Sequence, residues 1–195
     1  MKRTKLIMAL AVSVAILILL QMLLTPKYME HSPEGTLIGE YYENAGGNDV
    51  IFIGDCEVYE NFSTITLWEE YGITSYIRGS AQQTIWQSYY LMEETFRYET
   101  PKVMVFNVLS MKYDTPESTG SQSRREAYNR MTLDTMKWSP SKWNAILASM
   151  TEEEKQWDSM FTYLFPVLRY HDRWNQLTQE DFTYWFHRDT VSHNG

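Results

Sequence analysis

The sequence has one cysteine, Cys56, and four histidines among its 195 residues. A single cysteine excludes a disulfide within the chain. The histidines are not spaced as metal ligands usually are, so we predict no metal site, and no motif indicates a cofactor. An excess of positive charge is also lacking. The net charge of −8 argues against nucleic-acid binding, which requires a clustered basic face.

Long hydrophobic runs are scarce as well, since only the stretch from Leu6 to Leu24 is uncharged and almost wholly apolar. As a helix it would measure about 28 Å, close to the hydrocarbon thickness of a bilayer. The basic residues in front of it predict a cytoplasmic N-terminus and an extracytoplasmic bulk (Lys2, Arg3 and Lys5). We therefore predict a single-pass cell-membrane anchor over residues 1–25 rather than a cleaved signal peptide, whose apolar core is shorter.

The rest of the chain divides into three parts by composition. Residues 26–48 contain two prolines and four glycines, which indicates a stalk or entry loop. Residues 49–113 carry the short apolar runs of a folded core. Residues 114–195 begin with a polar loop and continue as aromatic-rich helices, in which we expect no further strand.

Apolar runs and helical repeats alternate in the core. Strands are predicted at Val50–Ile53, at Ile73–Ile77 and from Val103, and helices at Ser63–Tyr71 and Thr84–Tyr98. The order β-α-β-α-β with short connections predicts a parallel sheet with helices on both faces, a three-layer α/β/α fold. The carboxyl ends of parallel strands share one edge, where open α/β sheets bind ligands.

The turn after the first strand, Gly54-Asp55-Cys56-Glu57, has the residues of a nucleophile site. A tight turn there lifts the Cys56 side chain out of the sheet and aims backbone N–H groups at a developing oxyanion. Gly79, after the second strand, could bring a second N–H group to the same point. Each also has a simpler interpretation. Cys56 could be an inert buried thiol, and Glu57 could be a solvated carboxylate in a turn. Gly79 could simply be a glycine that a turn requires.

The run Val50-Ile51-Phe52-Ile53-Gly54-Asp55-Cys56-Glu57 resembles the first motif of the SGNH/GDSL hydrolases, a strand followed by Gly-Asp-Ser. The variant ending in Glu, behind an N-terminal anchor, is similar to the D-alanine transfer protein branch of teichoic-acid D-alanylation. The segment from Gly79-Ser80-Ala81-Gln82-Gln83 to Pro101-Lys102-Val103 also resembles that branch, which belongs to Gram-positive bacteria.

This resemblance implies a bacterial, membrane-anchored esterase or O-acyl-transfer protein that acts on cell-envelope polymers. Cys56 would take the nucleophile's position, and its N–H group with that of Gly79 would form the oxyanion hole. Other residues of the edge would contribute to binding (Asp55, Glu57, Ser80 and Gln82). The implied partners are a membrane-bound O-acyltransferase and an acylated polysaccharide or teichoic-acid-like polymer.

Three departures from the family pattern keep a non-enzymatic function open. Cysteine replaces serine, and the carboxylates beside it would raise its pKa. The family's oxyanion asparagine has only Asn107 as a candidate, which we place inside the third strand. No Asp-x-x-His motif supplies a base. We therefore expect an incomplete SGNH-like fold that is inactive by itself, or a scaffold that binds an acyl donor, a glycan or a partner.

Aromatic residues are concentrated near the end of the chain (Trp157, Phe161, Tyr163, Phe165, Tyr170 and Trp174). Their spacing favours a core or a helix-packing surface over a lipid-binding lid. They also admit a third class of function, a structural anchor or interaction protein that uses these helices.

Overall fold

The computed structural model of the chain describes residues 2–26, 34–184 and 186. Their contacts form two compact units. The helical unit is drawn from residues 1–27 and 157–189, and the sheet unit is drawn mainly from residues 28–156. The predicted boundary at residue 114 therefore falls inside the sheet unit. Residues 27–33 of the predicted stalk and 187–195 of the predicted helical segment lie outside the described residues.

The sheet unit contains the predicted parallel sheet of three strands, β1 (Val50–Gly54), β2 (Ser75–Gly79) and β3 (Val103–Phe106). The strand order is β2-β1-β3, and both pairs are parallel. The mixed α/β class and the parallel pairing are thus confirmed. The second strand begins at Ser75, two residues later than predicted.

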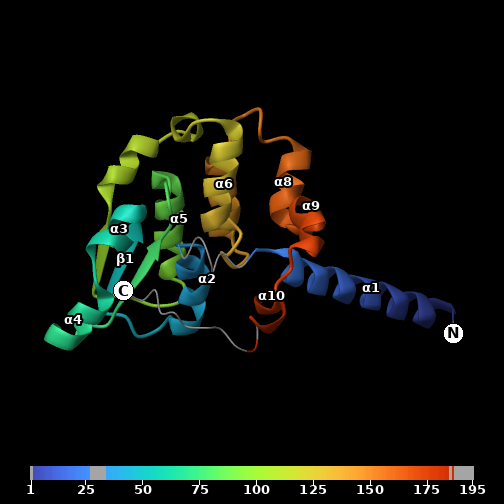
Figure 1. The fold of residues 1–195 in the computed structure, drawn as a ribbon, viewed down its shortest axis with the longest axis horizontal. Helices are drawn as coiled ribbons and strands as arrows, with labels where there is room; N and C mark the ends of the chain where they lie inside the picture. The colour runs from blue at the N-terminus through green and yellow to red at the C-terminus, as the bar shows by residue number, and fades with distance from the viewer. Residues whose placement is uncertain (1, 27–33, 185, 187–195) are drawn as a thin grey trace. The chain divides into compact units, whose positions relative to one another are not determined.

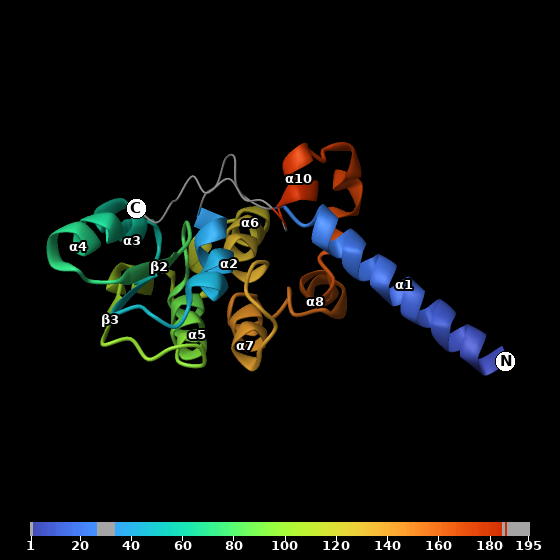
Figure 2. The same cartoon turned by 90° about the horizontal axis from the view of Figure 1, so that it is seen from below.

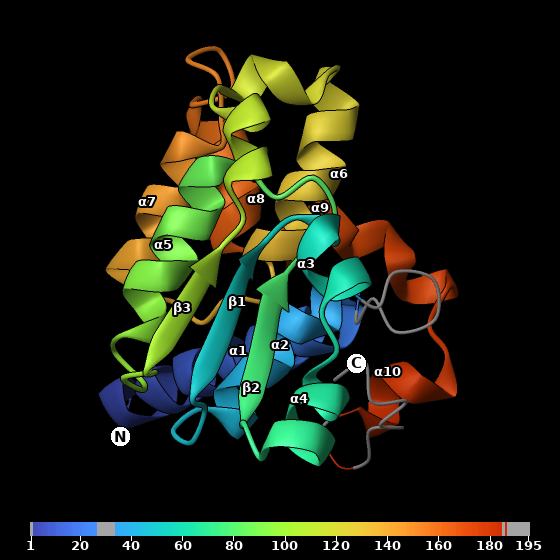
Figure 3. The same cartoon turned by 90° about the vertical axis from the view of Figure 1, so that its left-hand side faces the viewer.

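Helices cover both faces of the sheet (Figure 3). On one face Phe52 and Ile77, which are register partners, form an apolar cluster with Val58 of α3 (Cys56–Asn61). Leu67 of α4 (Thr64–Tyr71) packs against the same cluster. On the other face, the side chain of Arg78 reaches α5 (Ile85–Thr95). Alternation of side chains along each strand accounts for this separation.

The helix ends agree with the cap residues in the sequence. Ser63 caps α4 by accepting a hydrogen bond from the Thr66 N–H group, and Gly72 ends it in the left-handed conformation at φ 66°. Thr84 caps α5 in a capping box, and Ser139 caps α7 (Pro140–Ala148) ahead of a proline at the first turn.

The predicted loop over residues 26–48 is wrong where the structure describes it, because α2 spans Glu34–Asn44. Leu37, Ile38 and Tyr41 lie on one side of this helix and are buried. The glycine that suggests a loop, Gly39, serves close packing instead, since a Cβ there would lie 3.2 Å from the Cβ atom of Thr135. The apolar spacing of three and four residues outweighs the glycine content.

Short helices complete the sheet unit. The chain passes from β3 through η1 (Val108–Tyr113) and η2 (Pro116–Thr119) to α6 (Gln122–Leu133). The helices α6 and α7 then pack beside α5, on the side of α5 away from α3 (Figures 2 and 3). Residues 114–156 are therefore part of the same fold as the sheet.

The helical unit contains α1 (Lys2–Leu24), followed after residue 156 by four short helices (Figure 1). These are α8 (Trp157–Leu164), α9 (Val167–Tyr170), η3 (His171–Asn175) and α10 (Gln179–Thr183). Within the part of α1 from Arg3 to Leu24, an 18-residue stretch has a mean hydropathy of 2.8. This part of α1 is long and apolar enough to cross a membrane.

Candidate functional site

Cys56 lies at the carboxyl edge of the sheet, but in a helix rather than in the predicted tight turn. It is the first residue of α3, which starts directly after β1. Asp55 is the N-cap of this helix, and its Oδ1 atom accepts a hydrogen bond from the Glu57 N–H group at 3.2 Å. Asp is among the most favoured N-cap residues, and this cap outweighs the loop that the glycine suggests.

Asn107 joins the same edge, and its predicted position inside the third strand is wrong. It follows β3 and caps η1, where its Oδ1 atom accepts a hydrogen bond from the Leu109 N–H group at 2.8 Å. Its Nδ2 atom donates to Asp55 Oδ1 at 2.7 Å. The neighbouring position, Gly54, has no room for a side chain because a Cβ would overlap that of Asn107. The structure therefore brings Asp55 and Asn107 together beside Cys56.

Gly79 ends β2 and is the register partner of Gly54. A Cβ at Gly79 would lie 2.7 Å from Cγ2 of Val58 and 3.1 Å from the carbonyl oxygen of Gly54. The close approach of α3 to the sheet thus explains the glycine by itself. This packing also keeps the start of α3, with Cys56, close to the ends of both strands.

Gly79→Ala is expected to lower the free energy of unfolding by about 1–3 kcal/mol, because the added methyl group overpacks the contact with Val58. Chemical denaturation of the full chain in detergent would measure this. Gly47→Ala is the matched control, since nothing lies within 4 Å of a methyl group there. The loss in the double variant Gly79→Ala/Val58→Ala should be smaller than the sum of the two single losses, because Val58→Ala removes the overlapping methyl group. An unaltered stability of Gly79→Ala would contradict the close approach.

Ser80 and Gln82, the predicted binding residues after β2, have different environments. Ser80 is fully buried, and its hydroxyl contacts Gln83 Oε1 at 3.2 Å and the Thr132 hydroxyl. Gln82 is partly exposed and has a positive φ of 50°, which is uncommon outside glycine. The turn therefore directs Ser80 into the protein interior, so that of these two residues only Gln82 reaches the surface.

The electrostatics of the edge disfavour a thiolate. Burial raises the pKa of the Cys56 thiol, and the carboxylates of Asp55, Glu60 and Glu57 raise it further. A helix N-terminus usually lowers a cysteine pKa, but here three acidic residues surround it. Burial also raises the pKa of Asp55, although the hydrogen bonds from Glu57 and Asn107 favour its charged form. Cys56 is therefore a partly exposed and largely protonated thiol at neutral pH.

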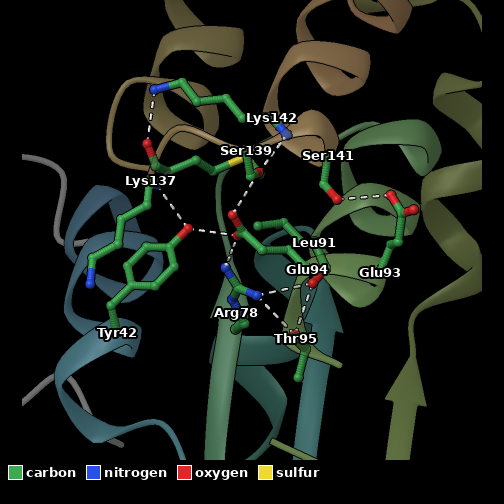
Figure 4. A network of polar contacts seen from close by, with 11 residues as sticks. Tyr42, Arg78, Leu91, Glu93, Glu94, Thr95, Lys137, Ser139, Ser141 and Lys142 are labelled. Atoms are coloured by element: carbon green, nitrogen blue, oxygen red, sulfur yellow. Dashed lines mark hydrogen bonds and ion pairs between the residues drawn. The ribbon is translucent and has the colours of Figure 1, made fainter. Parts of the chain in front are cut away.

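Sequence reasoning missed a buried polar network that lies below this edge (Figure 4). Arg78 and Glu94 form an ion pair at 2.9 Å, and both side chains are completely buried. Arg78 also donates to the Leu91 carbonyl at 2.9 Å and to the Thr95 hydroxyl at 2.8 Å. A charged residue within the apolar strand β2 was the available signal, because a buried charge requires a partner.

Two hydroxyl groups also donate hydrogen bonds to the Glu94 carboxylate. Tyr42 of α2 donates to it at 2.6 Å, and Ser139 at the start of α7 donates at 3.1 Å. The ring of Tyr41 stacks on the Arg78 guanidinium, with 3.9 Å between them. The network thus connects β2, α2, α5 and the start of α7, and it fixes the layer of helices behind the sheet.

A second buried network extends from Ser80 through neutral side chains. Gln87 Nε2 donates to Asn129 Oδ1 at 2.8 Å and to the Ser149 hydroxyl at 2.9 Å, and its Oε1 accepts from Thr132 at 3.3 Å. These contacts join α5 to α6 and to the end of α7. Within residues 2–26, 34–184 and 186, no group of three or more His, Cys, Asp or Glu residues could hold a metal ion.

Comparisons with known proteins do not extend this description. No protein-family model, no curated protein and no solved structure matches the chain. The resemblance of the first strand and its turn to the SGNH/GDSL hydrolases therefore stays a prediction from the residues. The chemistry of the edge has to be judged from its own contacts.

Proposed function

We propose that the chain is a membrane-tethered, SGNH/GDSL-like binding protein of the bacterial cell envelope, in which Cys56 is not a nucleophile. Its ligand would be an acylated polymer, such as a teichoic-acid-like polysaccharide, or the acyl donor of a membrane-bound O-acyltransferase. The motif resemblance supports the ligand class. The length and apolar composition of α1 support a single-pass tether. The basic residues before the apolar run support a cytoplasmic N-terminus.

The observation that carries this proposal is the acidic surrounding of the thiol without a base. The four histidines of the sequence are His31, His171, His187 and His193, so residues 34–156 contain none. Asp55, the acid next to the thiol, is occupied as a helix cap and as an acceptor for Asn107. An acyl group could contact the exposed part of this edge, but no histidine on these elements is present to take the thiol proton.

Alkylation of Cys56 by iodoacetamide is expected to reach half its maximal rate at a higher pH than alkylation of free cysteine. The cause is the raised pKa of the thiol, which burial and the neighbouring carboxylates produce. Glu60→Gln should move the profile toward lower pH, since it removes one of these charges, whereas the distant Glu69→Gln should not. A profile centred near pH 7 or below would contradict a binding-only site.

The second candidate is an esterase or O-acyl-transfer enzyme, which the juxtaposition at the sheet edge favours. Cys56 and Asn107 follow β1 and β3, and Gly79 ends β2, so the three residues lie at the edge where ligands bind in open α/β sheets. In that case Cys56 would attack an acyl ester, its N–H group with that of Gly79 would hold the oxyanion, and a histidine from outside residues 34–156 would act as base.

Hydrolysis of p-nitrophenyl acetate by the full chain separates the two candidates. Equal rates for the wild type and Cys56→Ala support binding without turnover, while a large loss in Cys56→Ala supports the enzyme. Binding itself can be followed by calorimetry with an O-acetylated polysaccharide and with the same polymer after mild alkaline deacetylation. The binding proposal requires that Cys56→Ala retain the preference for the acetylated form.

A further inference from the structure

The burial of α1 changes sharply near its C-terminal end. The side chains from residue 6 to residue 20 are exposed, whereas Gln21, Met22 and Leu23 are partly covered and Leu24 is only 6 % exposed. The covering segments are α9, η3 and α10, which lie beside the end of α1 in Figures 1 and 2. The polypeptide after residue 156 thus returns to the point where the apolar run ends.

Arg173 holds this arrangement together. Its Nη1 atom donates to the carbonyl oxygen of Leu24 at 3.2 Å, and its Nη2 atom pairs with Asp181 at 2.9 Å. The carbonyl groups in the last turn of a helix have no N–H donor within their own helix. The Arg173 guanidinium supplies a donor to one of them. Asp181 is 2 % exposed and also accepts from the Thr178 N–H group at 3.0 Å. The short helices are therefore fixed to the end of α1 by specific polar contacts.

The same helices expose large apolar side chains. Tyr163 and Tyr184 are buried, at 4 % and 8 % exposure, and account for part of the small core. Of the aromatic residues predicted to form a core or a helix-packing surface, Phe161, Phe165 and Trp174 are 40 %, 50 % and 70 % exposed, so they are not core residues. Leu168, Phe182 and Phe186 are exposed as well, at 53 %, 56 % and 91 %. An apolar surface of this kind marks an interaction site rather than a solvated face.

The length of α1 places this surface relative to a bilayer. The uncharged run from Leu6 to Leu24 spans about 28 Å, so that its last residues coincide with the outer limit of the hydrocarbon core. Segments that cover Gln21 to Leu24 therefore meet the interfacial layer. Tryptophan and other aromatic side chains are enriched at that depth in membrane proteins.

We propose that α8, α9, η3 and α10 form a second, interfacial membrane anchor, whose exposed aromatic and aliphatic side chains insert into the outer layer of the bilayer beside α1. The occupant of the apolar surface is the phospholipid interface. The proposal rests on α1 spanning the membrane, and it adds that these four short helices are held at the bilayer surface instead of extending into the extracytoplasmic space.

Spin-label accessibility in phospholipid vesicles tests this, because Cys56→Ala removes the single native thiol. In that background, one cysteine is introduced at a time at Leu168 and at Trp174 and labelled with a nitroxide. The control Trp68→Cys labels an equally exposed aromatic position of the sheet unit, at 59 % exposure. Ile16→Cys labels the middle of α1. Each full chain is reconstituted in vesicles of phosphatidylcholine and phosphatidylglycerol, and collisions with oxygen and with a water-soluble nickel chelate are compared.

Labels at Leu168 and Trp174 are expected to lose most of the accessibility to the nickel chelate that the Trp68 label shows, and to gain accessibility to oxygen. If the Ile16 label is lipid-embedded while the labels at 168 and 174 behave as the Trp68 label does, α1 spans the bilayer and the interfacial anchor is refuted. If the Ile16 label is itself exposed to the chelate, the transmembrane assignment fails, and the anchor fails with it.

Discussion

Glu94→Gln is expected to lower the free energy of unfolding by about 3–5 kcal/mol, the usual cost of breaking a buried ion pair by removing one charge. Arg78 would stay fully buried without a counter-charge, since its other acceptors are the neutral Leu91 carbonyl and Thr95 hydroxyl. The glutamine is nearly isosteric and can still accept from Tyr42, so the loss reports the charge rather than the shape. Denaturant unfolding in detergent, followed by circular dichroism, measures it.

Glu93→Gln is the matched control for this prediction. Glu93 is the neighbouring residue on α5, it is exposed, and its carboxylate accepts one hydrogen bond from Ser141 at 2.8 Å. Its replacement should change stability by less than about 0.5 kcal/mol. The double variant Arg78→Met/Glu94→Leu should be more stable than Glu94→Gln alone, because it buries no charge. A loss below about 1 kcal/mol for Glu94→Gln would mean that water reaches the pair.

The sequence predicts those parts of the fold in which local signals agree with the tertiary structure. The first strand is a continuous apolar run that ends at a glycine, and it lies where the pattern places it. The second strand is predicted two residues early, because Ile73 is apolar but belongs to the helix end. Its N–H group bonds to the Leu67 carbonyl at 3.1 Å, as part of the structure that Gly72 terminates. Apolar character alone does not separate a cap residue from a strand residue.

The candidate site was predicted only in part, for a related reason. Parallel pairing brings Cys56, Gly79 and Asn107 to one edge, and strand order is enough to infer that. The bond from Asn107 to Asp55 depends on the register of β3 against β1, which no local pattern specifies. The ion pair of Arg78 and Glu94 joins residues 16 positions apart through the packing of α5 on β2. Their pairing follows from the assembled layers rather than from either segment.

Lys142 is expected to make the stability of the sheet unit rise with pH above neutrality. The residue is 3 % exposed, and its ammonium group donates to the Met136 carbonyl at 2.8 Å. The pKa of Lys142 is lowered from 10.5 to about 8, chiefly by burial, which outweighs the opposite effect of Asp134 and Glu94, while Arg130 adds to the lowering. In the pH range between these two values, the unfolded chain binds the proton more tightly than the folded chain does.

The sign follows from this difference in proton affinity. Below about pH 8 the folded protein bears the full cost of burying the charge, up to about 3 kcal/mol for a depression from 10.5 to about 8. As the pH rises from 7 to 9.5, deprotonation in the folded state should remove about 2 kcal/mol of that cost. Cys56, Tyr41 and Tyr42 have raised pKa values and act in the opposite sense at alkaline pH. The quantity to measure is therefore the difference between the wild type and Lys142→Met.

Lys142→Met keeps the apolar stem and removes the charge, so the wild type should be less stable than this variant at pH 7 and should approach it by pH 9.5. Unfolding curves at matched ionic strength across this range provide the comparison. Lys102→Met is the control, because the Lys102 side chain is 79 % exposed and its replacement should give no such convergence. A constant difference between the wild type and Lys142→Met over the whole range would show that Lys142 stays charged when buried. Its pairing with Asp134 and Glu94 would then outweigh the desolvation that is expected to dominate here.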